Sequence, residues 1–129
     1  MSPEDLWRFL LFGYLLTVAL ETPVLVLLLS KHHRLRRRLF AGLWLTACTY
    51  PVVVLVLPTL FAGASRALYL VVAETFAPAA ECALFWLAFG GKGSEGVTRR
   101  DLAAIVAANL LSFFVGEVLT AYGWFGLFR

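Results

Sequence analysis

The sequence predicts an all-α membrane protein, in which four transmembrane helices form an antiparallel bundle. Apolar residues make up 61% of its 129 residues, against about 45–50% in soluble domains. Four apolar segments of twenty or so residues have the length a helix needs to cross about 30 Å of hydrocarbon. Only short charged or glycine-rich segments separate them, so we expect residues 1–129 to form a single transmembrane domain.

The first two helices are expected at about residues 6–29 and 39–61. The segment Ser2-Pro3-Glu4-Asp5 provides an N-cap, an early proline and acidic residues for the first turn. The second helix carries Thr46, Cys48, Thr49 and Tyr50 directly before Pro51. A proline inside a helix removes a backbone hydrogen bond, so we expect a bend at Pro51 that turns these polar side chains toward the other helices.

The third and fourth helices are expected at about residues 68–89 and 102–125. The third contains no lysine or arginine, yet it carries Glu74 and Glu81, seven residues apart and therefore on one face. Before the fourth helix, Thr98 is a candidate N-cap. Asp101, three residues later, completes an acidic variant of the capping box.

Basic residues predict the orientation of the chain. The connector at residues 31–38 has five, and the glycine-rich connector at residues 90–100 has three, whereas the opposite side has Arg8, Arg66 and Arg129. Because cytoplasmic loops are enriched in Lys and Arg, both connectors are expected in the cytoplasm and both termini on the non-cytoplasmic side. Nine arginines against two lysines, with abundant Ala and Leu, are typical of a GC-rich bacterial genome, which indicates an inner (plasma) membrane.

Intramembrane polar residues are the candidate site. At about 1.5 Å of rise per residue, Glu21, Glu81 and Asn109 fall at a similar depth, and polar residues of the second helix fall in the same slab. Glu74 and Glu117 fall in the other half of the membrane. An ionised side chain at the centre of a membrane helix costs about 2.5–3.5 kcal/mol, and we expect no intramembrane Lys or Arg as a counter-ion.

The acids must therefore be protonated, solvated in a cavity, hydrogen-bonded to one another or neutralised by a bound cation. We expect a ligand- or ion-binding site at Glu21, Glu81, Asn109, Glu74 and Glu117. The corresponding function is that of a transporter or channel-like protein for a cation, a proton-coupled solute or a cationic small molecule. Two alternatives stay open. The acids could only connect the helices through hydrogen bonds, or they could pair with basic residues of a partner in a larger membrane complex.

Other classes of function find little support in the sequence. It has no G-x-S-x-G or H-E-x-x-H motif and no intramembrane histidine, so we expect no catalytic residues and no enzyme. Cys48 and Cys82 lie in predicted helices and are expected to be reduced, while His32 and His33 are expected in a solvated loop that contacts lipid headgroups. Neither a metal nor a cofactor can be named. The expected partners are membrane lipid and a second copy of the chain or another membrane protein, with no nucleic acid.

Overall fold

The computed structural model describes residues 3–90 and 96–123, and all regular elements in this part of the chain are helical. Four helical segments are long and apolar enough to cross a membrane, which indicates a membrane protein. The elements are α1 (Pro3–Leu28), α2 (Leu35–Pro51), the π-helix η1 (Val52–Val56), α3 (Leu57–Leu60), α4 (Arg66–Phe89) and α5 (Arg99–Ala121).

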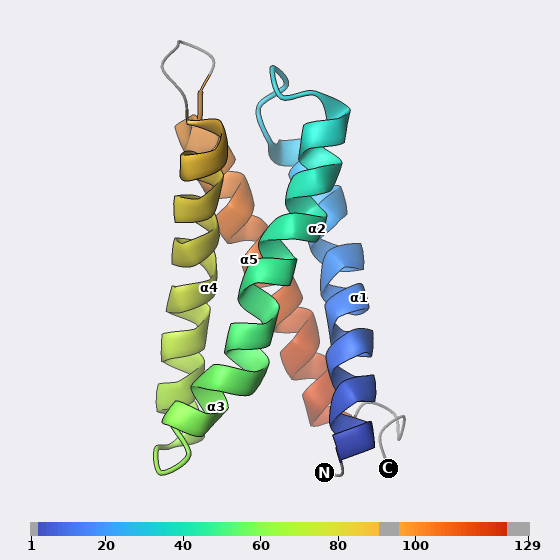
Figure 1. Cartoon of the computed structure of the whole chain (residues 1–129), viewed down its shortest axis with the longest axis vertical. Coiled ribbons are helices and arrows are strands. Elements are labelled where there is room, and N and C mark those ends of the chain that lie inside the picture. The colour runs from blue at the N-terminus through green and yellow to red at the C-terminus, as the bar shows by residue number, and fades with distance from the viewer. Residues whose placement is uncertain (1–2, 91–95, 124–129) are drawn as a thin grey trace.

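The helices run alternately up and down, and α1 and α4 stand on opposite sides of the bundle (Figure 1). Both α1 and α4 pack against α2 and α5, which lie between them and cross each other in this view. The start of α1 and the end of α5 lie at the same end of the bundle as the turn at residues 61–65. We call this the termini end, and the opposite end, with residues 29–38 and 96–100, the basic end.

All four long helices begin earlier than expected, and α1 begins at Pro3 instead of about residue 6. α2 begins at Leu35, so the second half of the basic connector is helical, and the expectation that residues 31–38 form a connector outside the helix is wrong there. α4 begins at Arg66 behind the N-cap Ser65. α5 begins at Arg99 because Thr98 and Asp101 form the predicted capping box, in which each side chain accepts the other's backbone N–H. α5 ends at Ala121 and Tyr122 is its C-cap, so the expectation that the fourth helix continues toward residue 125 is wrong at this point; Phe125 itself lies outside the described residues.

The bend expected at Pro51 takes the form of a π-helical turn. Pro51 ends the regular part of α2, and η1 follows it directly. A π-turn frees backbone groups from the regular α-helical pattern. One of them, the carbonyl of Val53, accepts a hydrogen bond of 2.7 Å from the Tyr69 hydroxyl of α4. The irregular turn is therefore tied to the neighbouring helix.

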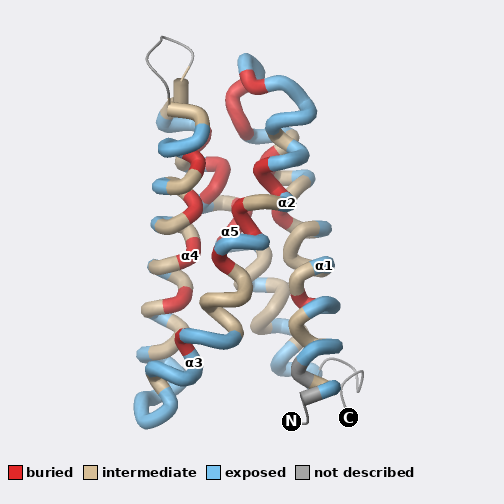
Figure 2. The backbone as a smooth tube through the Cα atoms, in the orientation of Figure 1, coloured by how far each residue is buried: buried red, intermediate tan, exposed pale blue. Residues whose placement is uncertain are grey.

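The packed core occupies the half of the bundle near the basic end, where the buried positions gather (Figure 2). Small residues let the helices approach closely here, and larger aliphatic side chains with one aromatic ring fill the remaining space. Because this half is packed, it provides the rigid frame for the polar residues below it. The core consists of Leu25, Leu29, Ala41, Leu45, Phe85, Ala104, Ile105 and Ala108.

Gly42 allows a close approach of α1 and α2. A Cβ atom at this position would lie 2.2 Å from Oγ1 and 2.8 Å from Cβ of Thr22, so the two helices would have to separate. We expect Gly42→Ala to lower the free energy of unfolding by about 1–3 kcal/mol, as overpacking does elsewhere. Gly116→Ala is the matched control, because a Cβ there meets nothing within 4 Å. Thermal unfolding of both variants in detergent checks this, and equal transitions would contradict it.

Candidate functional site

Glu21 of α1 and Glu81 of α4 are buried near the middle of the bundle, each with only 2% of its surface exposed. Together these two acids have four carboxylate oxygens, and each oxygen accepts one hydrogen bond from a neighbouring helix. Glu21 accepts from Ser112 at 2.5 Å and Thr46 at 3.2 Å, and Glu81 accepts from Asn109 at 2.6 Å and Thr49 at 2.7 Å.

The spacing of the donor residues explains why Glu21 and Glu81 both receive their hydrogen bonds at the same depth in the bundle. Thr46 and Thr49 are three residues apart on α2, and Asn109 and Ser112 are three apart on α5, so each helix presents two donors from one face. Because α2 and α5 lie between α1 and α4, each of them reaches both acids. All four long helices thus meet in one polar layer, as the depth estimate predicted.

Two hydroxyl groups in this layer have a choice of acceptor. Thr49 Oγ1 lies 2.7 Å from Glu81 and 3.1 Å from the carbonyl of Leu45, and Ser112 Oγ lies 2.5 Å from Glu21 and 3.0 Å from the carbonyl of Asn109. A hydroxyl has one proton to donate but can also accept. It can donate to an ionised glutamate, or it can accept from a protonated one and donate to its backbone carbonyl. The layer therefore has hydrogen-bond partners for both protonation states of each acid.

Asn109 has a fixed orientation in this layer. Its Nδ2 lies 2.6 Å from Glu81 and 2.9 Å from the carbonyl of Ile105, which can only accept. The amide group therefore directs both of its N–H bonds at these two acceptors. Asn109 acts as a donor to Glu81, which places it in the position that the sequence suggested for it beside the acids.

A cavity of about 420 Å³ extends from the two buried acids toward the termini end. Its deep end is formed by Glu21, Glu81 and the polar layer, and Arg66 and Thr120 line it near the termini end. The Arg66 side chain is 58% exposed, so the cavity reaches the surface there. Toward the basic end the packed core closes the bundle. The candidate residues thus lie along one cavity that reaches the surface near the termini end.

Glu74 and Glu117 line the same cavity nearer its opening. Both oxygens of Glu117 accept hydrogen bonds from the Arg66 guanidinium, at 2.8 and 3.0 Å. The expectation that no basic residue is available as a counter-ion is therefore wrong for Glu117, because Arg66 in the first turn of α4 reaches it. All five residues of the expected site line this cavity, but only Glu21, Glu81 and Asn109 share the polar layer.

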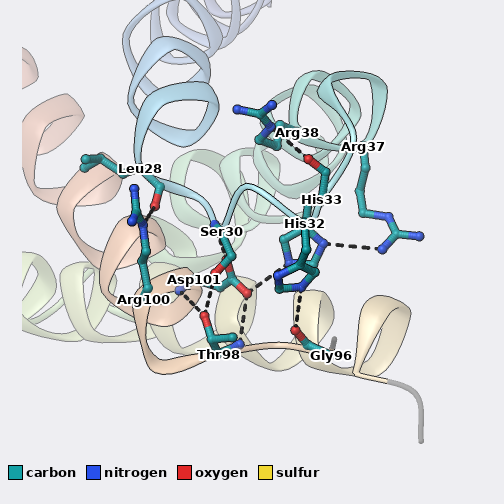
Figure 3. A network of polar contacts seen from close by, with 10 residues as sticks. All are labelled: Leu28, Ser30, His32, His33, Arg37, Arg38, Gly96, Thr98, Arg100 and Asp101. Carbon is teal, nitrogen blue, oxygen red and sulfur yellow. Dashed lines mark hydrogen bonds and ion pairs between the residues drawn. The ribbon is translucent and has the colours of Figure 1, made fainter. Parts of the chain in front are cut away.

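A second buried network closes the basic end, around Asp101 at the start of α5 (Figure 3). Asp101 is fully buried and accepts hydrogen bonds from the backbone of Ser30 at 2.7 Å and of Thr98 at 2.9 Å. His33 Nε2 lies 2.9 Å from its second oxygen. The network thus joins the loop after α1 to the first turn of α5, and it completes the closure of the bundle at this end.

The position of His33 corrects the expectation of a solvated histidine loop. His33 is fully buried and packs edge-on against Phe85, while His32 is exposed and bonds to the carbonyl of Gly96. His33 Nδ1 lies 3.3 Å from Arg37, which can only donate, so Nδ1 accepts and Nε2 donates to Asp101. The basic neighbours in the sequence concealed this pairing, because its partner lies 68 residues away.

The same cluster has ligand atoms close enough to hold a metal ion, since one atom each of His32, His33 and Asp101 lies within 4.8 Å of the others. The hydrogen bonds within this cluster make metal binding unfavourable. A metal at Nε2 of His33 would require the proton on Nδ1, where the Arg37 guanidinium already donates. Asp101 is also occupied by two backbone N–H groups. We therefore interpret this cluster as a structural connection.

The polar layer and the cavity are the features that any functional assignment has to explain. The sequence identified the acids and Asn109 but not the roles of Ser112, Tyr69 or Arg66, since these depend on contacts between helices. In comparisons with known proteins, no protein-family model, no curated protein and no solved structure matches this chain.

Proposed function

We propose that the protein transports a cation across the membrane in exchange for protons, with Glu21 and Glu81 as the shared binding site. The observation that carries this proposal is the position of these acids at the closed end of a cavity, with hydroxyl partners that suit both protonation states. A site that exchanges protons for a cation needs both properties. It must hold the charged and the neutral carboxyl group, and it must be reachable from the surface.

The charges around the cavity favour a positively charged substrate. Four glutamates and one arginine line it, and the arginine is already paired with Glu117. A cleft lined by one sign of charge, with walls of low dielectric constant, concentrates ions of the opposite sign. The substrate classes that fit are an inorganic cation and a cationic small molecule.

The proposed orientation places the basic end in a bacterial cytoplasm, as the count of Lys and Arg predicts. The cavity then opens to the non-cytoplasmic side, and the core with the Asp101 network separates the acids from the cytoplasm. Transport requires a second state in which the basic end opens. A chain of 129 residues offers few helices to enclose a pathway, so we propose that it works as a homo-oligomer or with a second membrane protein.

The competing function is that of a non-transporting subunit whose acids pair with basic residues of a partner. The hydrogen bonds favour transport for Glu21 and Glu81, because all four of their oxygens already have donors within the chain. A basic side chain of a partner would have to displace these donors and enter through the cavity.

Proton flux into liposomes tests the proposal. We expect wild-type protein, reconstituted around a trapped pH-sensitive dye, to move protons when a gradient of sodium, potassium, magnesium or benzyltrimethylammonium ions is imposed. Glu21→Gln and Glu81→Gln keep the side-chain shape but cannot exchange a proton, so each should lower the flux at least tenfold. Glu4→Gln, the same change at an exposed position in the first turn of α1, should leave it unchanged.

Two results would count against transport. One is a flux through the Gln variants equal to that of the wild type. The other is loss of a co-purifying membrane protein in these variants with no flux in the wild type, which would support the subunit function. Mass measurement of the protein purified in mild detergent checks the oligomer and any partner.

A further inference from the structure

Glu74 occupies the middle of the cavity. On α4 it lies seven residues from Glu81 and eight from Arg66, which corresponds to about 10 Å and about 12 Å along the helix axis. A seven-residue step nearly completes two turns, so Glu74 and Glu81 face the same side, and both line the cavity. Anything that moves from the opening to the polar layer passes Glu74.

The Glu74 carboxylate differs from the other three because it has no partner of its own. Within the described residues, it accepts no hydrogen bond and forms no ion pair. Each carboxylate oxygen of Glu21 and Glu81 already accepts a hydrogen bond in the polar layer, and Glu117 accepts hydrogen bonds from Arg66. A half-buried carboxylate that faces a cavity without a partner is the group best placed to receive a charged ligand.

The walls around Glu74 do not suit a bare inorganic ion. Calcium and magnesium require about six or more oxygen ligands, whereas the wall near Glu74 consists mainly of small, aliphatic and aromatic side chains. Ala73 and Ala77 lie on the same helix as Glu74, and at Gly116 on α5, which lines the same cavity, an added Cβ would meet nothing within 4 Å, so the cavity has open space at its α5 wall. Such walls stabilise an apolar body through burial.

Aromatic rings complete this environment. Tyr50, Tyr69 and Phe113 come from three different helices and line the cavity. The Tyr69 hydroxyl is bonded to Val53, and the Tyr50 hydroxyl lies against Gly13, which keeps both rings in place. The faces of such rings attract ammonium groups, most strongly where water is excluded.

We propose that the cavity is the binding site of an organic ammonium ion with an apolar body, whose charge pairs with Glu74 and whose body packs against Tyr50, Tyr69 and Phe113. This inference rests on the proposed function and narrows its substrate to one class. The volume of about 420 Å³ lies within the range of about 300–1,000 Å³ that small-molecule sites occupy. From this site, the ligand can move on to Glu21 and Glu81 when those acids release protons.

Equilibrium binding to the purified full-length protein in detergent tests the inference without any transport. The probe is benzyltrimethylammonium, which combines a permanent charge with an apolar body. We expect Glu74→Gln, which removes the charge but keeps the shape, to weaken binding at least tenfold. Glu4→Gln, the same change outside the cavity, should bind the probe like the wild type. Thermal unfolding of both variants checks that they are folded.

Three further measurements test the contributions of the probe's charge, the shape of the cavity and competition by inorganic ions. Neopentylbenzene, the uncharged isostere of the probe, should bind at least tenfold more weakly than the probe itself. Gly116→Leu should also weaken probe binding at least tenfold, because its side chain grows into the open space of the cavity without changing any charge. Sodium, potassium, magnesium and calcium ions at millimolar concentration should not displace the probe.

The outcomes distinguish this inference from the proposed function. If Glu74→Gln binds the probe as tightly as the wild type, or if the inorganic ions displace it, the organic ammonium site is overturned, even where Glu21→Gln and Glu81→Gln have lost proton flux. If Glu74→Gln has lost binding while these two variants still carry protons normally, the site stands and exchange at the buried pair is overturned.

Discussion

Asp101→Leu is expected to lower the free energy of unfolding by about 3–5 kcal/mol, because it leaves three buried donors without an acceptor and each such group costs about 1–3 kcal/mol. The substitution leaves the backbone N–H groups of Ser30 and Thr98 and the Nε2 of His33 without their acceptor. None of these three donors has a second acceptor in the described part of the chain. The penalty of burying them unpaired therefore adds to the loss of the bonds themselves.

Unfolding of the purified protein in detergent, followed by tryptophan fluorescence, measures this effect. Glu117→Gln is the matched comparison on the same helix, because it also removes a carboxylate that accepts hydrogen bonds. The Arg66–Glu117 pair is partly exposed, with 58% and 37% of the side-chain surfaces accessible, so we expect a change of only about 0–1 kcal/mol. Equal effects for the two variants would show that the Asp101 network is not what holds the basic end together.

The double substitution Glu21→Leu and Glu81→Leu is expected to abolish proton flux while the protein still folds. Thr49 and Ser112 keep an alternative acceptor, the carbonyls of Leu45 and Asn109. Thr46 and one N–H of Asn109 keep none in the described part of the chain. Because a buried donor left unpaired costs about 1–3 kcal/mol, we expect a lower free energy of unfolding but no loss of the fold.

The same liposome assay and the same unfolding experiment check the double variant. Asn109→Leu provides a useful comparison, since it leaves Glu81 with the Thr49 hydroxyl as its remaining partner and should destabilise the protein by about 1–3 kcal/mol. A double leucine variant that does not fold would mean that the acids serve the structure, and flux that persists in it would remove them from the pathway.

The polar layer could be predicted because the depth of a residue in a regular helix follows from its position in the sequence. A constant rise per residue places Glu21, Glu81 and Asn109 at one depth whatever the details of packing. The sequence could not show that Thr46 reaches Glu21 and Thr49 reaches Glu81, because this depends on how α2 crosses its neighbours.

At the basic end, the prediction made for His33 from its neighbours in the sequence is wrong. A histidine among five basic residues indicates a solvated loop, yet His33 is buried against Phe85 and Asp101, which are 52 and 68 positions away in the chain. The sequence did reveal Asp101 as part of the capping box, and that role is confirmed. Its second role at the same time, as the acceptor for His33 and Ser30, has no sequence signal because it arises only when α1 and α5 pack together.

The π-helical turn at Val52–Val56 also determines which residues face the entrance to the cavity. A π-turn accommodates one residue more than an α-helical turn. An uninterrupted helix would therefore present the residues after it at an angle different by about 100°, the rotation per residue that 3.6 residues per turn implies. In the observed register, Leu57 is buried and Pro58 lines the cavity. The shape of this entrance thus depends on the number of residues in the turn, and a deletion within it would change the entrance without replacing any side chain there.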